Sequence, residues 1–461
     1  MITNISITLI WGLIKWFTSW QIEETAESTG FKQRESKLKP TTFFQTFTVG
    51  LWSLHEVTLN TLAGKCEELQ SQLKLTRQGL FDRISTGAKL LKELFNQAMT
   101  YATTKDLSTE TIEVLKQFRD VQIVDSSTVS LPDKLEKRHK GLGGTNAKAA
   151  IKIQVVFSII RRAFKVIEIL KATGNDSDKT VDLAAKLLAM ELIIFDLGYY
   201  NAKAFRDIDE RGAFFISRVK ANTVFYEENL EKANRYIKID ISKELKLYKK
   251  SVDKWIYIGG TSSNRMKVRL VAIRLPNHIA AERIRKARKK AKTKGRDLTK
   301  DEIHLLAWNV MITNVPEDML KAETICELYR IRWQVELIFK CWKGCFGIDE
   351  MNNVGDKYFE CIMYGRLIVI TLMTAIYSRL LYVLYAQSRE LLSFIMFFKN
   401  LREKLSTLID LLQASKLDKT SLKTLFESIV EKSIYEKRKR KTTEQELMEH
   451  DLPDVILQML A

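Results

Sequence analysis

The sequence predicts a mixed α/β fold with helical regions at both ends of the chain. Two short apolar runs, 121–125 and 191–196, have the continuous β-rich pattern of strands that are buried on both faces of a sheet. The segments 150–160 and 164–171 predict a neighbouring pair of strands. Five prolines in the whole chain and no Gly/Ser-rich linker indicate that the regions are tightly joined.

The pattern along the chain changes character several times, which divides the sequence into five segments. The predicted segments are 1–105 (helical), 106–220 (strands and helices), 221–304 (mainly strands), 305–350 (a strand and a helix) and 351–461 (helical). The strands expected in the third segment are 236–241, 254–258 and 267–275, followed by a basic helix at 282–292, and the helices expected after 351 are 357–387, 390–413 and 419–441.

Four polar residues share one face of the helix predicted over 327–343. Tyr329, Arg332, Glu336 and Lys343 are separated by three, four and seven residues. At about 100° per residue these offsets place all four within an arc of roughly 60°. A carboxylate can bind a hard metal ion, and flanking cations suit an anionic substrate such as a phosphate backbone. The alternative is an ordinary solvated face of an amphipathic helix.

This four-residue pattern resembles the YREK signature of bacterial insertion-sequence DDE transposases, the cut-and-paste class with hairpin-forming members. The resemblance implies that Glu336 is the third metal-binding carboxylate and that two aspartates precede it, each at the end of a strand. Asp125 ends the first apolar run, and Asp196, followed by Leu-Gly-Tyr, matches the second-aspartate motif of the class. The predicted catalytic and metal-binding triad is therefore Asp125, Asp196 and Glu336.

The resemblance also implies a fold, a reaction and partners. It implies a ribonuclease H-like catalytic core in two parts, 106–220 and 305–350, interrupted by the β-rich insertion 221–304. Three carboxylates suit two Mg²⁺ ions, for which Mn²⁺ can substitute, because Mg²⁺ prefers oxygen ligands. The expected partners are double-stranded DNA, both terminal inverted repeats and target DNA, and a second copy of the chain in a homodimeric synaptic complex.

Further DNA-binding residues are expected from the same resemblance. Tyr329, Arg332 and Lys343 are expected to bind phosphates around the active site. Trp308 stands 28 residues before Glu336, where better-known members of the class stack a tryptophan on a flipped base, although a tryptophan that starts a strand is otherwise ordinary core. Arg218 and Lys220 alternate along a strand-like run and are expected to contact phosphates.

The segment 58–85 has the layout of a helix-turn-helix. A first helix at 61–69 and a second at 75–84 flank a polar break, and the second helix would present Arg77, Gln78 and Arg83 to a major groove. The alternative is a plain helical hairpin. The resemblance places the terminal-repeat-binding domain in residues 1–105, which favours DNA binding, whereas the C-terminal region would serve subunit assembly or end binding.

The charge of the chain agrees with a polyanionic partner. It has 74 Lys+Arg against 56 Asp+Glu, a formal net charge of +18, with basic clusters at 282–292 and 436–441. Five scattered cysteines and five histidines do not favour a zinc site, because Cys341 and Cys345 have no second pair to complete a tetrahedral set. We interpret the cysteines as thiols of a reducing cytoplasm, where a prokaryotic nucleoid-associated protein would act.

Two apolar segments raise the question of a membrane. Residues 1–20 lack a basic leader region and a small-residue cleavage site, so they predict a core helix. The apolar run 367–375 is too short to span a bilayer before Arg379 interrupts it, so it predicts a buried helix and no membrane partner.

Two rival functions remain open at this point. One is a DNA-binding relic that occupies DNA without cutting it, and the other is a different endonuclease of the same fold. The triad argues against the first, and the complete Tyr-Arg-Glu-Lys set together with Trp308 argues against the second.

Overall fold

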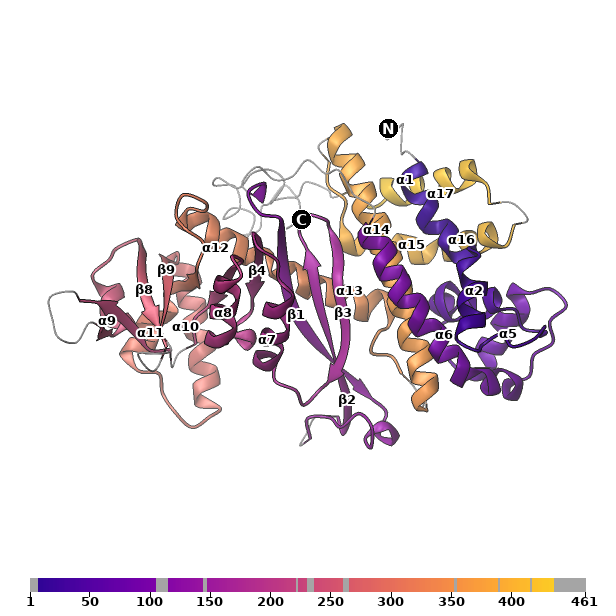
Figure 1. Ribbon diagram of the computed structural model, residues 1–461, viewed down its shortest axis with the longest axis horizontal. Helices are drawn as coiled ribbons and strands as arrows, with labels where there is room; N and C mark the ends of the chain where they lie inside the picture. Colours follow the sequence, from indigo (N-terminus) through magenta and orange to yellow (C-terminus); the bar gives the residue numbers. More distant parts are fainter. Residues whose placement is uncertain are drawn as a thin grey trace.

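The computed structural model describes residues 7–104, 115–143, 147–220, 223–229, 236–259, 265–351, 355–388, 390–414 and 417–434. A sheet crosses the middle of the molecule, and helices from both ends of the chain gather on one side of it (Figure 1). The opposite end of the sheet carries short helices and the strands of segment 221–304 (Figure 1). The predicted mixed α/β fold is confirmed.

A single sheet contains all ten strands that the described residues form. The strands are β1 (Asp120–Leu131), β2 (Ala149–Ser158), β3 (Ala163–Lys171), β4 (Glu191–Phe195), β5 (Phe214–Arg218), β6 (Phe225–Glu228), β7 (Tyr236–Ile239), β8 (Ser251–Ile258), β9 (Met266–Arg274) and β10 (Trp308–Thr313). Their order is β3-β2-β1-β4-β5-β10-β9-β8-β6-β7. Strands β1, β4 and β5 are parallel, and the pairs β1–β2, β2–β3, β5–β10 and β9–β10 are antiparallel.

The strands predicted in segment 221–304 form, but they are not a separate sheet. Because β9 pairs with β10 over six residues, β6 to β9 extend the sheet that contains β1 to β5. The sequence pattern could not predict this junction, since strand pairing depends on contacts between distant residues rather than on local periodicity.

Helices cover both faces of the sheet. One face carries α7 (Asp176–Lys186) and α8 (Ala202–Glu210), and near its far end lie α9 (Ile241–Lys246), α10 (Asn277–Lys292) and α11 (Lys300–Leu306). The other face carries α12 (Ala322–Ile331) and α13 (Trp333–Phe346). Local caps fix several of these helices: the Asn201 side chain accepts hydrogen bonds from the backbone of Lys203 and Ala204 at the start of α8.

The two ends of the chain form one helical region. The N-terminal helices are α1 (Ile7–Lys15), α2 (Gln21–Ser28), α3 (Pro40–Gln45), α4 (Leu51–Ser53), α5 (Leu59–Leu69) and α6 (Arg77–Thr104), with the π-helical turn η2 (Thr46–Gly50). The C-terminal helices are α14 (Asp356–Ser388), α15 (Phe394–Glu403), α16 (Leu405–Gln413) and α17 (Lys419–Glu431). Helix α14 packs along α6, and α1 contacts both α14 and α17.

The apolar segment 367–375 is a buried helix, as predicted, and residues 7–18 of the first apolar segment are helical with one buried face, whereas its residues 1–6 lie outside the described residues. Leu13, Ile14 and Phe17 of the first segment are fully buried. Helix α14 has the length and composition of a membrane span, but 83% of its most apolar window is buried inside the protein. The helix predicted over 390–413 is instead two helices, α15 and α16, and the basic cluster 436–441 lies outside the described residues.

Gly365 allows α14 to pass close to η2. A Cβ at this position would lie 1.9 Å from the backbone oxygen of Phe47. We expect Gly365→Ala to destabilise the protein by about 1–3 kcal/mol or more, because a backbone atom cannot rotate out of the way. The measurement is the thermal unfolding midpoint. Gly64→Ala on α5 is the matched control, since its Cβ would meet no atom within 4 Å and should leave the midpoint unchanged or slightly higher. Equal midpoints for Gly365→Ala and the wild type would contradict the packing argument.

Candidate active site

Two aspartates lie side by side on neighbouring parallel strands. Asp196 directly follows the end of β4, whereas Asp125 lies inside β1, which continues to Leu131 and corrects the prediction that Asp125 ends its strand. The parallel ladder pairs Val124 of β1 with Phe195 of β4, so the next residues, Asp125 and Asp196, are adjacent across the two strands. Because alternate residues of a strand share a face, the Asp125 and Asp196 side chains lie on the same face of the sheet as Ile123 and Ile194, which belong to the larger hydrophobic core. This is the face that α13 covers. The sheet therefore presents two carboxylates to the helix that carries Glu336.

That helix is interrupted, which corrects the prediction of one continuous helix over 327–343. Helix α12 ends at Ile331 and α13 begins at Trp333, with Arg332 between them. The backbone N–H of Arg332 donates to the backbone oxygen of Tyr329 at 3.2 Å, and the backbone N–H of Val335 donates to the backbone oxygen of Arg332 at 3.1 Å. These bonds span three residues rather than four, so the chain is tightened for one turn at this point.

Arg332 contacts all three carboxylates of the predicted triad. Its guanidinium lies 3.0 Å from an oxygen of Asp125, 3.5 Å from one of Asp196 and 2.9 Å from one of Glu336. The Tyr329 hydroxyl donates to the same Asp196 oxygen at 3.2 Å. The Arg332 side chain is only 14% exposed, whereas that of Glu336 is 46% exposed. The structure thus brings residues from β1, β4, α12 and α13 to one partly open site.

Burial shifts the proton affinities of this site. Loss of hydration raises the pKa of Asp125 to about 6, although the Ser126 N–H bond and the Arg332 charge act in the opposite direction. Burial likewise raises the pKa of the Tyr329 phenol, and the charge of Asp196 raises it further. The phenol therefore keeps its proton near neutral pH and acts as a hydrogen-bond donor.

The donor set of the site suits a hard divalent ion, but its present arrangement does not form a metal centre. Within the described residues, no group of three His, Cys, Asp or Glu side chains is arranged to hold a metal ion. Arg332 supplies the positive charge among the three carboxylates instead. Carboxylate oxygens are the ligands that Mg²⁺ prefers, so the chemistry of the residues fits such an ion once the guanidinium has moved aside.

A polar network that sequence reasoning missed lies beside Asp125. The Ser126 hydroxyl donates to Asp176 at 3.2 Å, and Lys152 contacts the same oxygen at 2.9 Å. Asp176 is the first residue of α7. An acidic residue in the first turn of a helix is too common to single out from sequence, since it is favoured there by the helix dipole.

Three more residues that were predicted to contact DNA phosphates, Lys343, Arg218 and Lys220, lie at different places around the site. The Lys343 ammonium lies on the third turn of α13 and donates to the Thr128 oxygen at 3.5 Å, so it faces β1 beyond Asp125. Arg218 ends β5, the strand next to Asp196. The Lys220 ammonium donates to the backbone oxygen of Tyr200 at 3.2 Å and lies 5.4 Å from the centre of the Tyr200 ring.

Trp308 is a core residue in this structure. It is 2% exposed and belongs to the smaller of the two hydrophobic cores, and its indole is therefore not available to a base without movement. We expect Trp308→Ala to destabilise the protein by about 3–5 kcal/mol, because it would leave a large cavity. The thermal unfolding midpoint measures this, and Trp333→Ala, at a 45% exposed position, should lower it far less. A midpoint for Trp308→Ala no lower than that of Trp333→Ala would contradict the buried placement.

The predicted helix-turn-helix segment forms two helices, α5 and α6, but α6 is far longer than a recognition helix. Arg77 and Gln78 are exposed, and the Gln78 amide donates to Asp82 at 2.7 Å. The Arg83 guanidinium lies 4.3 Å from the centre of the Phe31 ring and donates to the Phe31 oxygen. Arg83 therefore holds α6 to the N-terminal helices rather than facing solvent.

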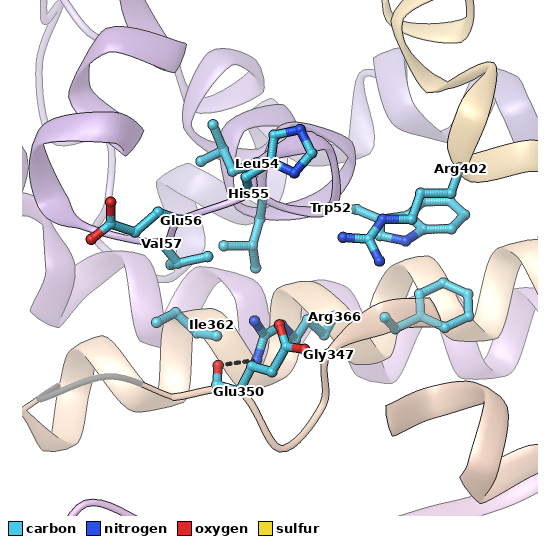
Figure 2. A pocket seen from close by; sticks show the side chains of 12 residues that line it. Trp52, Leu54, His55, Glu56, Val57, Gly347, Glu350, Ile362, Arg366 and Arg402 are labelled. Atoms are coloured by element: carbon cyan, nitrogen blue, oxygen red, sulfur yellow. Dashed lines mark hydrogen bonds between the residues drawn. The ribbon is translucent and has the colours of Figure 1, made fainter. Parts of the chain in front are cut away.

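A separate cavity lies between the helical region and the end of α13. It has a volume of about 50 Å³ and is lined by residues of α4, the segment after it, α13 and α14. Figure 2 shows the Arg366 guanidinium donating to the backbone oxygen of Glu350, at 3.0 Å. The volume holds a few water molecules and is far below that of a nucleotide-sized pocket. It contains none of the three carboxylates, so the active-site candidate is the open site around Arg332.

Comparison with known proteins shows the family of the chain. The family model described as "Transposase DDE domain" matches residues 116–372, a range that includes all three carboxylates. The transposase of insertion sequence element IS1151 from Clostridium perfringens is 30% identical over 371 residues, which are 77% of each chain. The transposase of IS231B from Bacillus thuringiensis subsp. berliner is 27% identical over 419 residues, 87% of this chain and 86% of the relative. The transposase of IS231F from Bacillus thuringiensis subsp. israelensis is 28% identical over 397 residues, 83% of this chain and 82% of the relative. The chain therefore belongs to the DDE transposases of bacterial insertion sequences.

Proposed function

We propose that this transposase binds the terminal inverted repeats of its own insertion sequence and catalyses Mg²⁺-dependent strand cleavage and strand transfer by a cut-and-paste route. The convergence of Asp125, Asp196 and Glu336 on one guanidinium carries the proposal. One guanidinium can offset only one of three negative charges, so the cluster retains an excess of negative charge that a divalent cation would neutralise. The expected substrates are the two element ends and the target duplex.

The arrangement of the sheet supports a ribonuclease H-like core for this reaction. The two aspartates are adjacent on the parallel strand β1 and directly after its neighbour β4, both inside the sheet, and the glutamate comes from a helix that covers the same face. We propose that two copies of the chain act together, because two ends of one element must be joined to one target. The net charge of +18 supports binding to DNA, since neutralised phosphates release counterions.

The three carboxylates would hold two Mg²⁺ ions, with Mn²⁺ as an alternative. Bound divalent ions would activate the attacking water or hydroxyl and stabilise the leaving oxyanion. Arg332 must first leave the carboxylates, and its planar guanidinium is then suited to bind two oxygens of a DNA phosphate. Tyr329 retains its proton and can donate to Asp196 or to a phosphate oxygen. Lys343 would bind a phosphate farther along β1.

The test is cleavage of a labelled duplex that carries the terminal repeat of the element, analysed on a denaturing gel. We expect cuts at the repeat boundary with Mg²⁺ and none with EDTA. Binding without any cut would support a DNA-binding relic, and cuts that are independent of the repeat would support a general endonuclease of the same fold. Either result would overturn the proposal.

A further inference from the structure

Three side chains form a row across the sheet at the active site. The parallel ladders of β1, β4 and β5 pair the residues that immediately precede Asp125, Asp196 and Arg218. These three residues therefore occupy neighbouring positions on adjacent strands, which are about 4.8 Å apart. The alternation of side chains places Arg218 on the same face as Ile216, which belongs to the same core as Ile123 and Ile194. Arg218 is thus one strand beyond Asp196, on the side away from Asp125.

A second arginine reaches the same place from segment 221–304. Arg218 pairs with Met311 of β10, and Asn309 is two residues earlier on the same face of that strand. The Arg283 guanidinium, from α10, donates to the Asn309 side-chain oxygen at 3.3 Å and to the Trp308 backbone oxygen at 3.5 Å. The guanidinium of Arg283 therefore lies above the end of β10 that is next to Arg218.

A third arginine comes from α12. Arg330 is adjacent in sequence to Tyr329, whose hydroxyl is bonded to Asp196. The charge of Arg330 acts on the Arg283 guanidinium, as that of Arg218 does: burial is the largest cause that lowers the pKa of Arg283, and these two charges lower it further. All three are neither fully buried nor fully exposed.

These arginines differ from the paired ones elsewhere in the protein. Arg332 contacts three carboxylates, Arg269 contacts Asp253 at 2.5 Å and Arg296 contacts Glu302 at 2.9 Å. Among the described residues, no carboxylate forms an ion pair with Arg218, Arg283 or Arg330. Three like charges held together at partly buried positions repel one another, and an anion between them would relieve that repulsion.

We infer that Arg218, Arg283 and Arg330 form a binding site for a phosphate of the DNA backbone next to the phosphate that is cut. The inference rests on the proposed function and specifies the course of the DNA strand. From the carboxylates the strand runs across the end of β5 to the start of β10 and on to α10. Exposed cations continue along that helix: Arg285, Arg288, Lys289 and Lys290. A guanidinium suits this task because it can donate two parallel hydrogen bonds to one phosphate.

The experiment combines protein and DNA changes. The full-length protein is titrated with a fluorescent duplex that carries the element end, in the presence of EDTA so that no cutting occurs, at several salt concentrations. We expect Arg283→Gln and Arg330→Gln each to weaken binding by about tenfold and to reduce the slope of log affinity against log salt by about one. Arg296→Gln, which removes a surface arginine already paired with Glu302, is the matched control and should bind as the wild type does.

Replacing single DNA phosphates with uncharged methylphosphonates identifies the phosphate that these arginines contact. The duplex is prepared with one methylphosphonate at each position flanking the cut in turn. At one position the substitution should weaken wild-type binding but have no additional effect on Arg283→Gln, because the variant has already lost that contact. Arg283→Lys keeps the charge and should recover part of the affinity.

If the effect of the methylphosphonate adds to that of Arg283→Gln at every position while the wild-type protein still cuts, this inference is overturned and the proposed function stands. A wild-type protein that neither binds nor cuts the end would overturn both.

Discussion

Replacing Asp125 with asparagine is expected to abolish cleavage of the element end while DNA binding is retained. Asparagine keeps the shape of the side chain and can still accept the hydrogen bond from the Ser126 N–H, but it lacks the charge that a divalent ion requires. Charge stabilisation by catalytic metal ions amounts to several kcal/mol, which corresponds to a loss of at least about a thousandfold in rate. Single-turnover cleavage with Mg²⁺ measures the loss, and Glu336→Gln should behave in the same way.

A folding defect can be separated from a catalytic one. Burial raises the pKa of Asp125 to about 6, so the carboxylate is mostly ionised at pH 7 but its charge lowers the stability of the DNA-free fold. The Asp125→Asn protein should therefore unfold at or above the wild-type temperature. Glu323→Gln, which neutralises an exposed carboxylate in the first turn of α12, is the matched control and should cut normally. Cleavage by Asp125→Asn within tenfold of the wild-type rate would show that Asp125 holds no metal ion.

Replacing Arg332 with methionine is expected to destabilise the ion-free protein and to increase its affinity for Mg²⁺. Methionine preserves most of the length of the side chain but leaves Asp125, Asp196 and Glu336 without a cation. Breaking a buried ion pair costs about 3–5 kcal/mol, and we expect about 1–2 kcal/mol here because Asp196 and Glu336 are more than one-third exposed. Mg²⁺ no longer competes with a guanidinium, so less of it should be needed to restore the unfolding temperature.

The measurement for Arg332→Met is thermal unfolding over a series of Mg²⁺ concentrations without DNA. Arg296→Met is the control, because it removes an arginine from an exposed ion pair and should shift the midpoint by less than about 0.5 kcal/mol in free energy. Cleavage by Arg332→Met should fall as well, since the phosphate loses a bidentate donor. An unchanged ion-free midpoint together with an unchanged Mg²⁺ dependence would refute the role of Arg332 as the internal cation.

The local pattern of the sequence determined the type of most elements. The strands predicted over 150–160 and 164–171 form within two residues of these limits, because continuous apolar β-rich runs have few alternatives in a packed core. The strand predicted over 121–125 forms as well, but it continues to Leu131. The membership in the DDE transposases, first indicated by the spacing of Tyr329, Arg332 and Glu336, is confirmed by the family match. The roles of the individual residues stay predictions.

Only the tertiary structure decided how these elements meet. It joined β9 to β10, so that segment 221–304 extends the central sheet, and it buried Trp308 and attached Arg83 to Phe31. The chain also tightens at Arg332, whose guanidinium lies among three carboxylates.

Hydrophobic periodicity and residue propensity act over a few residues, and they therefore determine whether a segment forms a helix or a strand. Strand pairing, burial and charge contacts instead join residues that can be more than two hundred positions apart, as in the hydrogen bond between Arg332 and Asp125, with a sequence separation of 207. The sequence therefore determined which carboxylates and cations this protein has, and the fold decided which of them share one site.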